Sequence, residues 1–190
     1  MSLMPPNENN SETAFTLDGK RVQAAPGETI WQVAKRQNIE IPHLCYAPEP
    51  GYRADGNCRA CMVEIEGERV LAASCIRQPT PDMVVYTNSE RATSSRRMVF
   101  ELLIADQPPN EIAHDSGSAF WRWADRMEIS ESRFSARSTP PPDTSHPAMA
   151  VNLDACINCT LCVRACREVQ VNDVIGMAHR GTDAKIVFDF

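Results

Sequence analysis

The chain has 190 residues, 43% of them hydrophobic, which is enough for one or two small domains with modest cores. A net charge of −6 argues against nucleic acid as a partner, and the sequence has neither a secretory signal nor the roughly 20 apolar residues that cross a bilayer. We therefore expect a cytoplasmic protein without membrane contact, in which the eight cysteines are metal ligands rather than disulfides.

The chain begins with a polar segment, residues 1–12, which we expect to be a disordered tail. The segment Phe15–Ala24 predicts a short β-hairpin, because Asp18-Gly19 is a strong two-residue turn signal between apolar residues. The residues that this hairpin offers to a core are Phe15, Leu17 and Val22.

A helix is predicted after the hairpin. Thr29 and Gln32 match a capping box, and apolar residues recur at helical spacing until Pro42. Two further strands are predicted at Met62–Ile65 and Arg69–Ala73. A hairpin, a helix and a cysteine-bearing loop follow one another in this order in small β-grasp domains.

Four cysteines lie in this loop and after it, at Cys45, Cys58, Cys61 and Cys75. Two of them are close in sequence and two are remote. This suits a [2Fe–2S] cluster, in which each of two irons takes two thiolates. We therefore predict a ferredoxin-like β-grasp [2Fe–2S] domain over residues 13–88.

Two other uses of these four cysteines stay open. A structural zinc site also takes four thiolates, although such sites usually consist of two close pairs and only one close pair is present here. A disulfide is the other alternative, and it is disfavoured in a reducing compartment.

The middle of the chain, residues 89–147, is predicted to be helical at first and then a linker. Ser89 is a candidate cap for a helix that runs to about Ala105. The expected inner face consists of Ala92, Met98, Val99, Leu102 and Leu103. The basic residues expected on other faces are Arg91, Arg96 and Arg97, as a solvated surface rather than a docking patch for an acidic partner.

A second, short helix or turn is predicted at Phe120–Arg126. Its residues Trp121 and Trp123 are two positions apart, a spacing that more often anchors a loop onto a core than forms a partner-binding surface. The segment Ser138–Pro147 contains four prolines and is predicted to be an extended linker.

The last segment, residues 148–190, contains the run Cys156, Cys159, Cys162 and Cys166, with spacings of two, two and three residues. This is the bacterial iron–sulfur run, which predicts a [4Fe–4S] cluster; a zinc knuckle is the alternative. A strand at Ala148–Leu153, a helical turn at Val163–Glu168, and a hairpin of Val171–Met177 with Ala184–Phe188 complete the prediction. Together they form half of a bacterial ferredoxin domain, so the expected fold class is α+β.

Three segments carry a resemblance to a known family: Pro42–Cys45, Gly56–Glu66 and Ala72–Cys75. With the C-terminal cysteine run, they resemble the N-terminal iron–sulfur region of the α subunit of NAD-dependent formate dehydrogenases that use molybdenum or tungsten. More broadly, they resemble the large peripheral subunit of complex I and the iron–sulfur subunits of NAD-linked hydrogenases. The resemblance covers nearly all of residues 13–190.

In that wider family a third cluster is held by one histidine and three cysteines. At the four corresponding positions this chain has Gln107, Glu111, His114 and Phe120. Because no cysteine remains there, we predict that the third cluster is absent and that His114 is an ordinary loop histidine.

The resemblance also bears on Cys166. In two-cluster ferredoxins the fourth cysteine of each run serves the other cluster, and no second run occurs in these 190 residues. The chain ends here at Phe190, so we expect an incomplete two-cluster unit. Our hypothesis is a labile [4Fe–4S] site that is completed by Cys166 or by a partner.

No nucleophile–base pair, phosphate loop or substrate site is evident, so catalysis by this chain alone is not expected. The resemblance implies a relay of single electrons during oxidation of formate to CO2. The implied partners are a molybdenum or tungsten catalytic domain or subunit and the flavin- and NAD-binding iron–sulfur subunits. The alternatives are an electron-transfer subunit of an NAD-linked hydrogenase and a non-catalytic zinc-binding interaction module.

Overall fold

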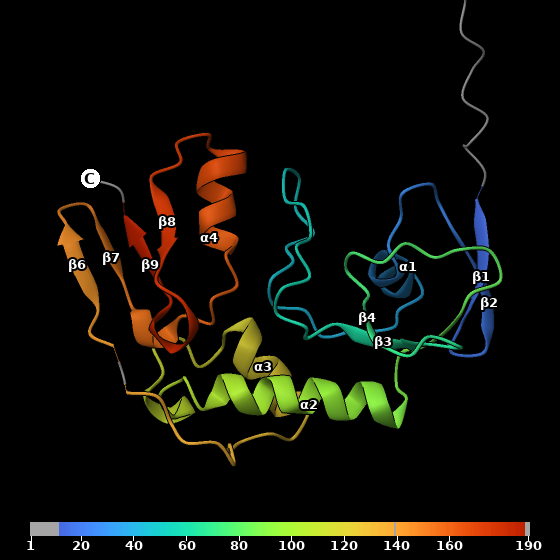
Figure 1. The fold of residues 1–190 in the computed structure, drawn as a ribbon, viewed down its shortest axis with the longest axis horizontal. Coiled ribbons are helices and arrows are strands. Elements are labelled where there is room, and N and C mark those ends of the chain that lie inside the picture. Colours follow the sequence, from blue (N-terminus) through green and yellow to red (C-terminus); the bar gives the residue numbers. More distant parts are fainter. Residues whose placement is uncertain (1–11, 139, 189–190) are drawn as a thin grey trace, which may run out of the picture. The chain divides into compact units, whose positions relative to one another are not determined.

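The computed structural model describes residues 12–138 and 140–188, so the predicted tail lies almost wholly outside the described residues. The chain divides into two compact units (Figure 1). The first unit consists of the described part of Met1–Ile41 together with Cys61–Thr93, and the second consists of Pro42–Ala60 together with the described part of Ser94–Phe190. None of the described helices is both long and apolar enough to span a membrane.

The first unit is built on a mixed five-stranded sheet in the order β2-β1-β5-β3-β4. Its strands are β1 (Thr13–Leu17), β2 (Lys20–Ala24), β3 (Met62–Ile65), β4 (Ala72–Ala73) and β5 (Val84–Tyr86). The β1–β5 pair is parallel and the other pairs are antiparallel. Together with helix α1 (Ile30–Arg36), this α+β arrangement is consistent with the predicted β-grasp fold.

The predicted hairpin is confirmed. Phe15 pairs with Val22 in the β1–β2 ladder, and both side chains are buried. The turn residues Asp18 and Gly19 have φ values of 49° and 80°, the left-handed conformation that such two-residue turns require. The turn chemistry of the sequence therefore sets the register of the first two strands.

The capping box of α1 is also confirmed. The Gln32 backbone N–H donates to Thr29 Oγ1 at 3.4 Å, and the Thr29 N–H donates to Gln32 Oε1 at 2.8 Å. Within α1, Trp31 Nε1 donates to the carbonyl of Ile41 at 3.2 Å, so the buried indole ties the helix to the segment that follows it.

Two details of the sheet differ from the prediction. The strand expected at Arg69–Ala73 is only Ala72–Ala73, because the chain turns at Gly67 with φ of 78° and Val70 is 58% exposed. Strand β5 was not predicted, since three residues carry too little periodicity for recognition from sequence.

Helix α2 (Glu90–Ile104) forms as predicted, with the Ala92 N–H donating to Ser89 Oγ at 3.1 Å. The predicted inner face is wrong in part, because Met98 and Leu102 are 38% and 48% exposed. The buried residues of the helix instead recur every four positions, at Ala92, Arg96 and Phe100. Arg96 is thus buried at 4% exposure, contrary to the expected solvated surface.

The second unit has a hydrophobic cluster around α2 and helix α3 (Ala119–Arg126). Its buried members are Leu44, Ala60, Phe100, Phe120, Trp121, Ala124 and Ile129. Trp121 is part of this cluster and Trp123 packs against it, which confirms that the two tryptophans anchor α3 onto a core.

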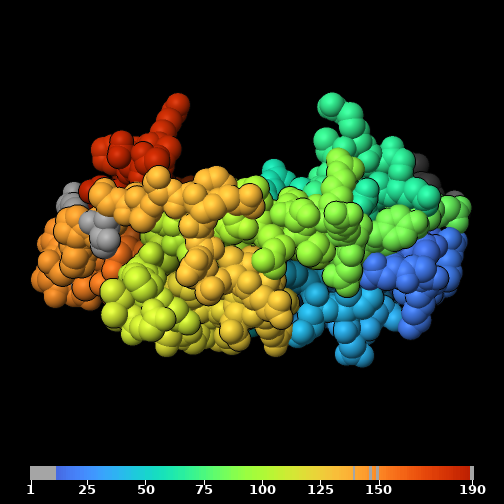
Figure 2. Space-filling view, turned by 90° about the horizontal axis from the view of Figure 1, so that it is seen from below, coloured from blue at the N-terminus to red at the C-terminus, as the bar shows by residue number. Residues whose placement is uncertain are grey.

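The chain after α3 returns along α2. Arg133 forms an ion pair with Glu101 at 2.6 Å, and the Arg137 N–H donates to the Ala105 carbonyl at 3.0 Å. Figure 2 shows this segment, in amber, lying against the yellow-green part of the second unit. A short 3-10 helix, η1 (Asn110–Ile112), lies between α2 and α3.

The end of the second unit contains two small antiparallel sheets. They pair β6 (Asp143–His146) with β7 (Met149–Val151), and β8 (Ile175–Ala178) with β9 (Lys185–Phe188). The linker prediction is therefore corrected, because its second half is strand β6. The predicted strand Val171–Met177 begins only at Ile175, because Val171 and Asp173 have positive φ.

Along the chain, three helical elements follow β7 and precede β8: η2 (Leu153–Ala155), α4 (Leu161–Arg164) and η3 (Ala165–Val169). The last of these is one π-helical turn, which continues α4 where Val163–Glu168 was predicted to be helical. A further 3-10 turn, η4 (Gly181–Asp183), joins β8 to β9.

Candidate metal centres

The C-terminal cysteine run occupies a tight loop and the helix that follows it. Asn158 and Thr160 have φ values of 52° and 61°, a left-handed conformation that curls the loop between its cysteines. The Asn158 N–H donates to Cys156 Sγ at 3.4 Å as part of this curl. The short spacings therefore translate into a backbone that wraps around its own thiols.

The thiols of this run are close enough to influence one another. The pKa of Cys159 is raised by burial and by the neighbouring thiolates, and the pKa of Cys162 is raised by burial and by the charges of Cys156 and Cys166. Such a group favours the thiolate form only when a cation is bound among the sulfurs. This environment fits a positively charged iron–sulfur core.

Cys166 is part of this group rather than remote from it. Its side chain is 7% exposed in η3, and its Sγ accepts a hydrogen bond from the Val174 N–H at 3.2 Å. Backbone N–H donors to sulfur stabilise the charged form of a cluster ligand. The sequence gives no sign of this donor, because any residue type at position 174 other than proline supplies the same N–H.

A second pair of cysteines lies in the loop Pro42–Ala60 of the same unit. The Cys58 N–H donates to Cys45 Sγ at 3.5 Å. The pKa of Cys58 is strongly raised, first by its hydrogen bond with the Cys45 thiol and then by burial. Cys58 also packs against the hydrophobic cluster around α2 and α3, which keeps water away from it.

The other two cysteines of the first four flank paired strands of the first unit. Cys61 directly precedes β3 and Cys75 lies two residues after β4, and each is 1% exposed. Met62 pairs with Ala73, and the Ser74 N–H and Oγ both donate to the Cys61 carbonyl, at 3.1 and 2.8 Å. The β3–β4 register therefore brings Cys61 and Cys75 to one end of the two strands.

The structure thus shows the first four cysteines as two pairs, each within its own unit, and the last four as one group. Within residues 12–138 and 140–188, no three cysteine, histidine or carboxylate side chains converge on the position of a single metal ion. The two pairs are joined along the chain by the short spacing between Cys58 and Cys61.

The four positions that correspond to the third cluster of the resembling family lie in two neighbouring cavities. Gln107, His114 and Phe120 line a cavity of about 230 Å³ together with Cys159, whereas Glu111 lines a different one. The Phe120 ring stacks on a core ring, and Gln107 Nε2 donates to the Cys156 carbonyl at 3.5 Å. The absence of a third cluster remains a prediction.

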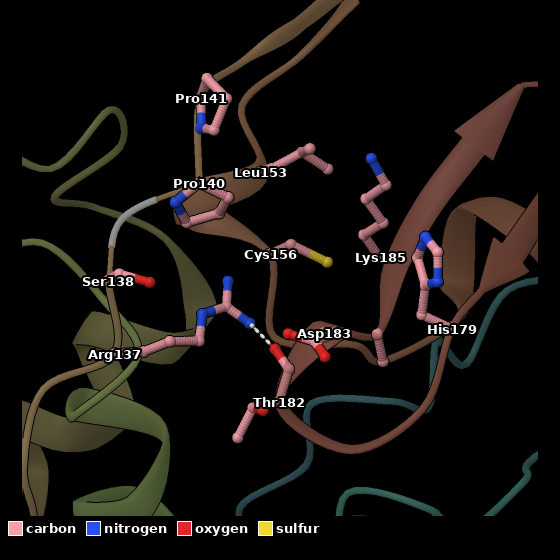
Figure 3. A pocket seen from close by; sticks show the side chains of 11 residues that line it. Arg137, Ser138, Pro140, Pro141, Leu153, Cys156, His179, Thr182, Asp183 and Lys185 are labelled. Atoms are coloured by element: carbon pink, nitrogen blue, oxygen red, sulfur yellow. Dashed lines mark hydrogen bonds between the residues drawn. The ribbon is translucent and has the colours of Figure 1, made fainter.

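A larger cavity, of about 590 Å³, opens beside Cys156 (Figure 3). Basic side chains line it, and Arg137 reaches across to donate to the Thr182 carbonyl at 3.4 Å. Figure 3 shows the Cys156 sulfur directed toward this cavity between Leu153 and Lys185. This thiol is accordingly only partly buried.

Comparison with known proteins bears on the N-terminal segment that contains the first four cysteines. Residues 10–90 match the family described as "2Fe-2S iron-sulfur cluster binding domain". This segment is similar to [2Fe–2S] cluster binding domains. It contains all four of the first cysteines, which supports the predicted [2Fe–2S] cluster, while the bounds 13–88 and the assignment of individual ligands stay predictions.

Nearly the whole chain is also similar to known proteins. It is 35% identical over 182 residues to the NADP-reducing hydrogenase subunit HndD of Solidesulfovibrio fructosivorans, covering 93% of this chain and 31% of that protein. It is 31% identical over 181 residues to the mitochondrial NADH-ubiquinone oxidoreductase 78 kDa subunit of Candida albicans, covering 93% of this chain and 25% of that protein. The chain therefore spans less than a third of the length of these two relatives.

A solved structure gives the same picture. A chain in the crystal structure of an NAD+-reducing [NiFe]-hydrogenase in the H2-reduced state superposes with a TM-score of 0.80 at 29% identity. The match covers 93% of this chain and 74% of that one. These similarities support the broad family suggested by the sequence and do not single out formate dehydrogenases.

Proposed function

We propose that the chain is an iron–sulfur electron-transfer module of an NAD(P)-linked oxidoreductase complex. The observation that carries this proposal is that backbone N–H groups donate to the sulfurs of Cys45, Cys156 and Cys166. Thiolates with such donors in largely buried surroundings are the ligands of iron–sulfur clusters.

The cysteines divide into two ligand sets. The proposed [2Fe–2S] set is Cys45, Cys58, Cys61 and Cys75, and the proposed [4Fe–4S] set is Cys156, Cys159, Cys162 and Cys166. Each cluster, when bound, accepts and donates one electron. The protein holds the thiols in place, donates hydrogen bonds to sulfur and limits the access of water.

The finer proposal is that the complex oxidises formate. It rests on the sequence around Cys45, Cys58, Cys61 and Cys75, and it implies a molybdenum or tungsten catalytic partner and flavin/NAD subunits. The second candidate is the electron-transfer part of an NAD(P)-linked hydrogenase. It is favoured by the similarity to the hydrogenase subunit HndD and to a chain of the [NiFe]-hydrogenase structure.

Iron and sulfide analysis with EPR of the reduced chain tests the cluster assignment. Two plus four irons give about six per fully loaded chain. We expect Cys166→Ser to lower this number and to make the four-iron signal more sensitive to oxygen than it is in the wild type. A robust four-iron signal that is unaffected by Cys166→Ser would contradict our view of a labile site, and a colourless, zinc-loaded chain would support the zinc-binding module instead.

Purification of the tagged chain from its source distinguishes the two complexes. We expect a molybdopterin subunit to co-purify and formate to reduce the clusters in that complex. Co-purification of a hydrogenase subunit, with reduction by H2 and not by formate, would favour the second candidate.

A further inference from the structure

Arg164 is a buried cation within the C-terminal cysteine run. It lies in α4, two residues from both Cys162 and Cys166, and its side chain is 4% exposed. A guanidinium removed from water is strongly destabilising unless its donors are paired. The partners of Arg164 therefore show what the residue does.

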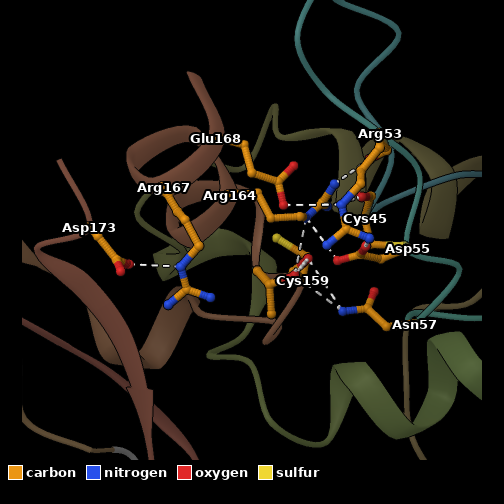
Figure 4. Close-up of polar contacts among 10 residues, drawn as sticks. Cys45, Arg53, Asp55, Asn57, Cys159, Arg164, Arg167, Glu168 and Asp173 are labelled. Atoms are coloured by element: carbon orange, nitrogen blue, oxygen red, sulfur yellow. Dashed lines mark hydrogen bonds and ion pairs between the residues drawn. The ribbon is translucent and has the colours of Figure 1, made fainter. Parts of the chain in front are cut away.

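Those partners come mainly from a loop more than 100 residues away in sequence. Arg164 donates to the backbone carbonyl of Cys45 and to that of Arg53, the latter at 2.5 Å, and its Nε lies 3.0 Å from Asp55 Oδ2 (Figure 4). Its Nε also lies 3.4 Å from Thr160 Oγ1, in the loop of the C-terminal run. An arginine presents five N–H donors on a planar fork and so reaches acceptors on several sides, whereas a lysine has three donors on a single nitrogen.

A second layer of contacts joins the same two segments. Arg53 pairs with Glu168 at 3.1 Å, beyond the far end of α4. Asn57 Nδ2 lies 3.5 Å from the Cys159 carbonyl and 3.4 Å from Thr160 Oγ1. Figure 4 shows the side chains of Arg53, Asp55 and Asn57 directed toward the C-terminal run. The loop is thus held at several points, and the buried guanidinium of Arg164 is one of them.

We propose that Arg164 is a positioning residue that holds the Cys45 loop against the helix carrying Cys162 and Cys166, so that the order of one cysteine group depends on the other. For the cofactors this rests on the proposed function, because Cys45 is assigned to the [2Fe–2S] set and Cys162 to the [4Fe–4S] set. Removal of the guanidinium from this one helix then alters the environment of both clusters.

Hydrogen exchange of the full chain tests the positioning role without any cluster. Arg164→Gln should speed the exchange of amides in residues 46–57 by about tenfold, because it leaves two carbonyls and a carboxylate without their donor. Arg164→Lys should give an intermediate increase, since it keeps the charge and loses the fork. The matched control is Arg167→Gln, three residues along the same helical segment, where an exposed arginine pairs with Asp173.

Asp55→Asn is a milder variant that keeps the test decisive if Arg164→Gln does not fold, and it should speed the exchange of the same amides. Equal exchange in residues 46–57 for wild type, Asp55→Asn and every folded Arg164 variant would overturn the proposal.

EPR of the reduced, iron-loaded chain provides a readout that a purely structural role would not move. We expect Arg164→Gln to change the line shape and midpoint potential of the [2Fe–2S] signal, and Arg167→Gln to leave both unchanged. Faster exchange with an unchanged [2Fe–2S] signal would overturn the dependence between the two clusters. A wild-type chain that binds no iron would refute the proposed function, while the exchange experiment would still decide the role of Arg164.

Discussion

Replacement of Phe100 by alanine tests the hydrophobic cluster that supports Cys58. The Phe100 ring is 0% exposed and stacks on Phe120 with ring centroids 5.7 Å apart and an interplanar angle of 7°. A buried phenylalanine truncated to alanine costs about 3–5 kcal/mol of unfolding free energy, the upper part of which reflects lost ring stacking. With a urea slope of about 2 kcal/mol/M, the unfolding midpoint should fall by about 1.5–2.5 M.

The assay is urea unfolding followed by tryptophan fluorescence, since Trp121 and Trp123 lie in or against the same cluster. Leu102→Ala is the matched control on the same helix, because Leu102 is 48% exposed, and it should change the unfolding free energy by no more than about 0.5 kcal/mol. Equal destabilisation by the two substitutions would refute the assignment of the buried face of α2. We also expect Phe100→Ala, and not Leu102→Ala, to lower the iron content of the purified chain.

Two further predictions concern α1 and the thiols. Thr29→Ala removes the hydroxyl that accepts from the Gln32 N–H. The free energy of unfolding should therefore fall by about 1 kcal/mol and the melting temperature by about 4–8 °C. An unchanged melting temperature would contradict the role of the cap. The pKa of Cys58 is raised by its hydrogen bond with Cys45 and by burial, and that of Cys159 by burial, so the folded metal-free chain holds these thiol protons more tightly than the unfolded chain does. This stabilisation is fully present below the ordinary thiol pKa of 9.0 and is lost as the pH rises from there toward the higher pKa of the folded chain. The urea midpoint of the metal-free chain should therefore fall as the pH rises above about 9, and a flat profile would show that the thiols do not contribute.

Local signals in the sequence were sufficient for several elements. Asp18-Gly19 predicts the first hairpin because few other residues adopt the left-handed turn, and Thr29 with Gln32 predicts the start of α1 because the two side chains satisfy free N–H groups. The cysteine spacings likewise indicated the segment that matches the [2Fe–2S] family, because ligand chemistry restricts residue type more strongly than packing does.

Features that depend on tertiary packing were not predictable in this way. Apolar residues occur on several sides of α2, so the sequence did not show that Phe100 would be buried and Met98 exposed. Arg164 lies between two cysteines, and its burial depends on acceptors near Cys45, far away in the chain. The Val174 N–H that donates to Cys166 is a backbone group, which residue type does not encode.

The place of β5 in the sheet constrains the order in which the first unit is completed. β5 lies between β1 and β3, so it alone joins the β1–β2 hairpin to the β3–β4 pair. It is also the last of the five strands to be synthesised, and Cys45 through Cys75 all precede it. During translation these thiols therefore leave the ribosome before the sheet can close, while β1 and β3 each have an unpaired edge. For the proposed [2Fe–2S] ligand set, we therefore expect stable cluster insertion to follow the pairing of Val84–Tyr86.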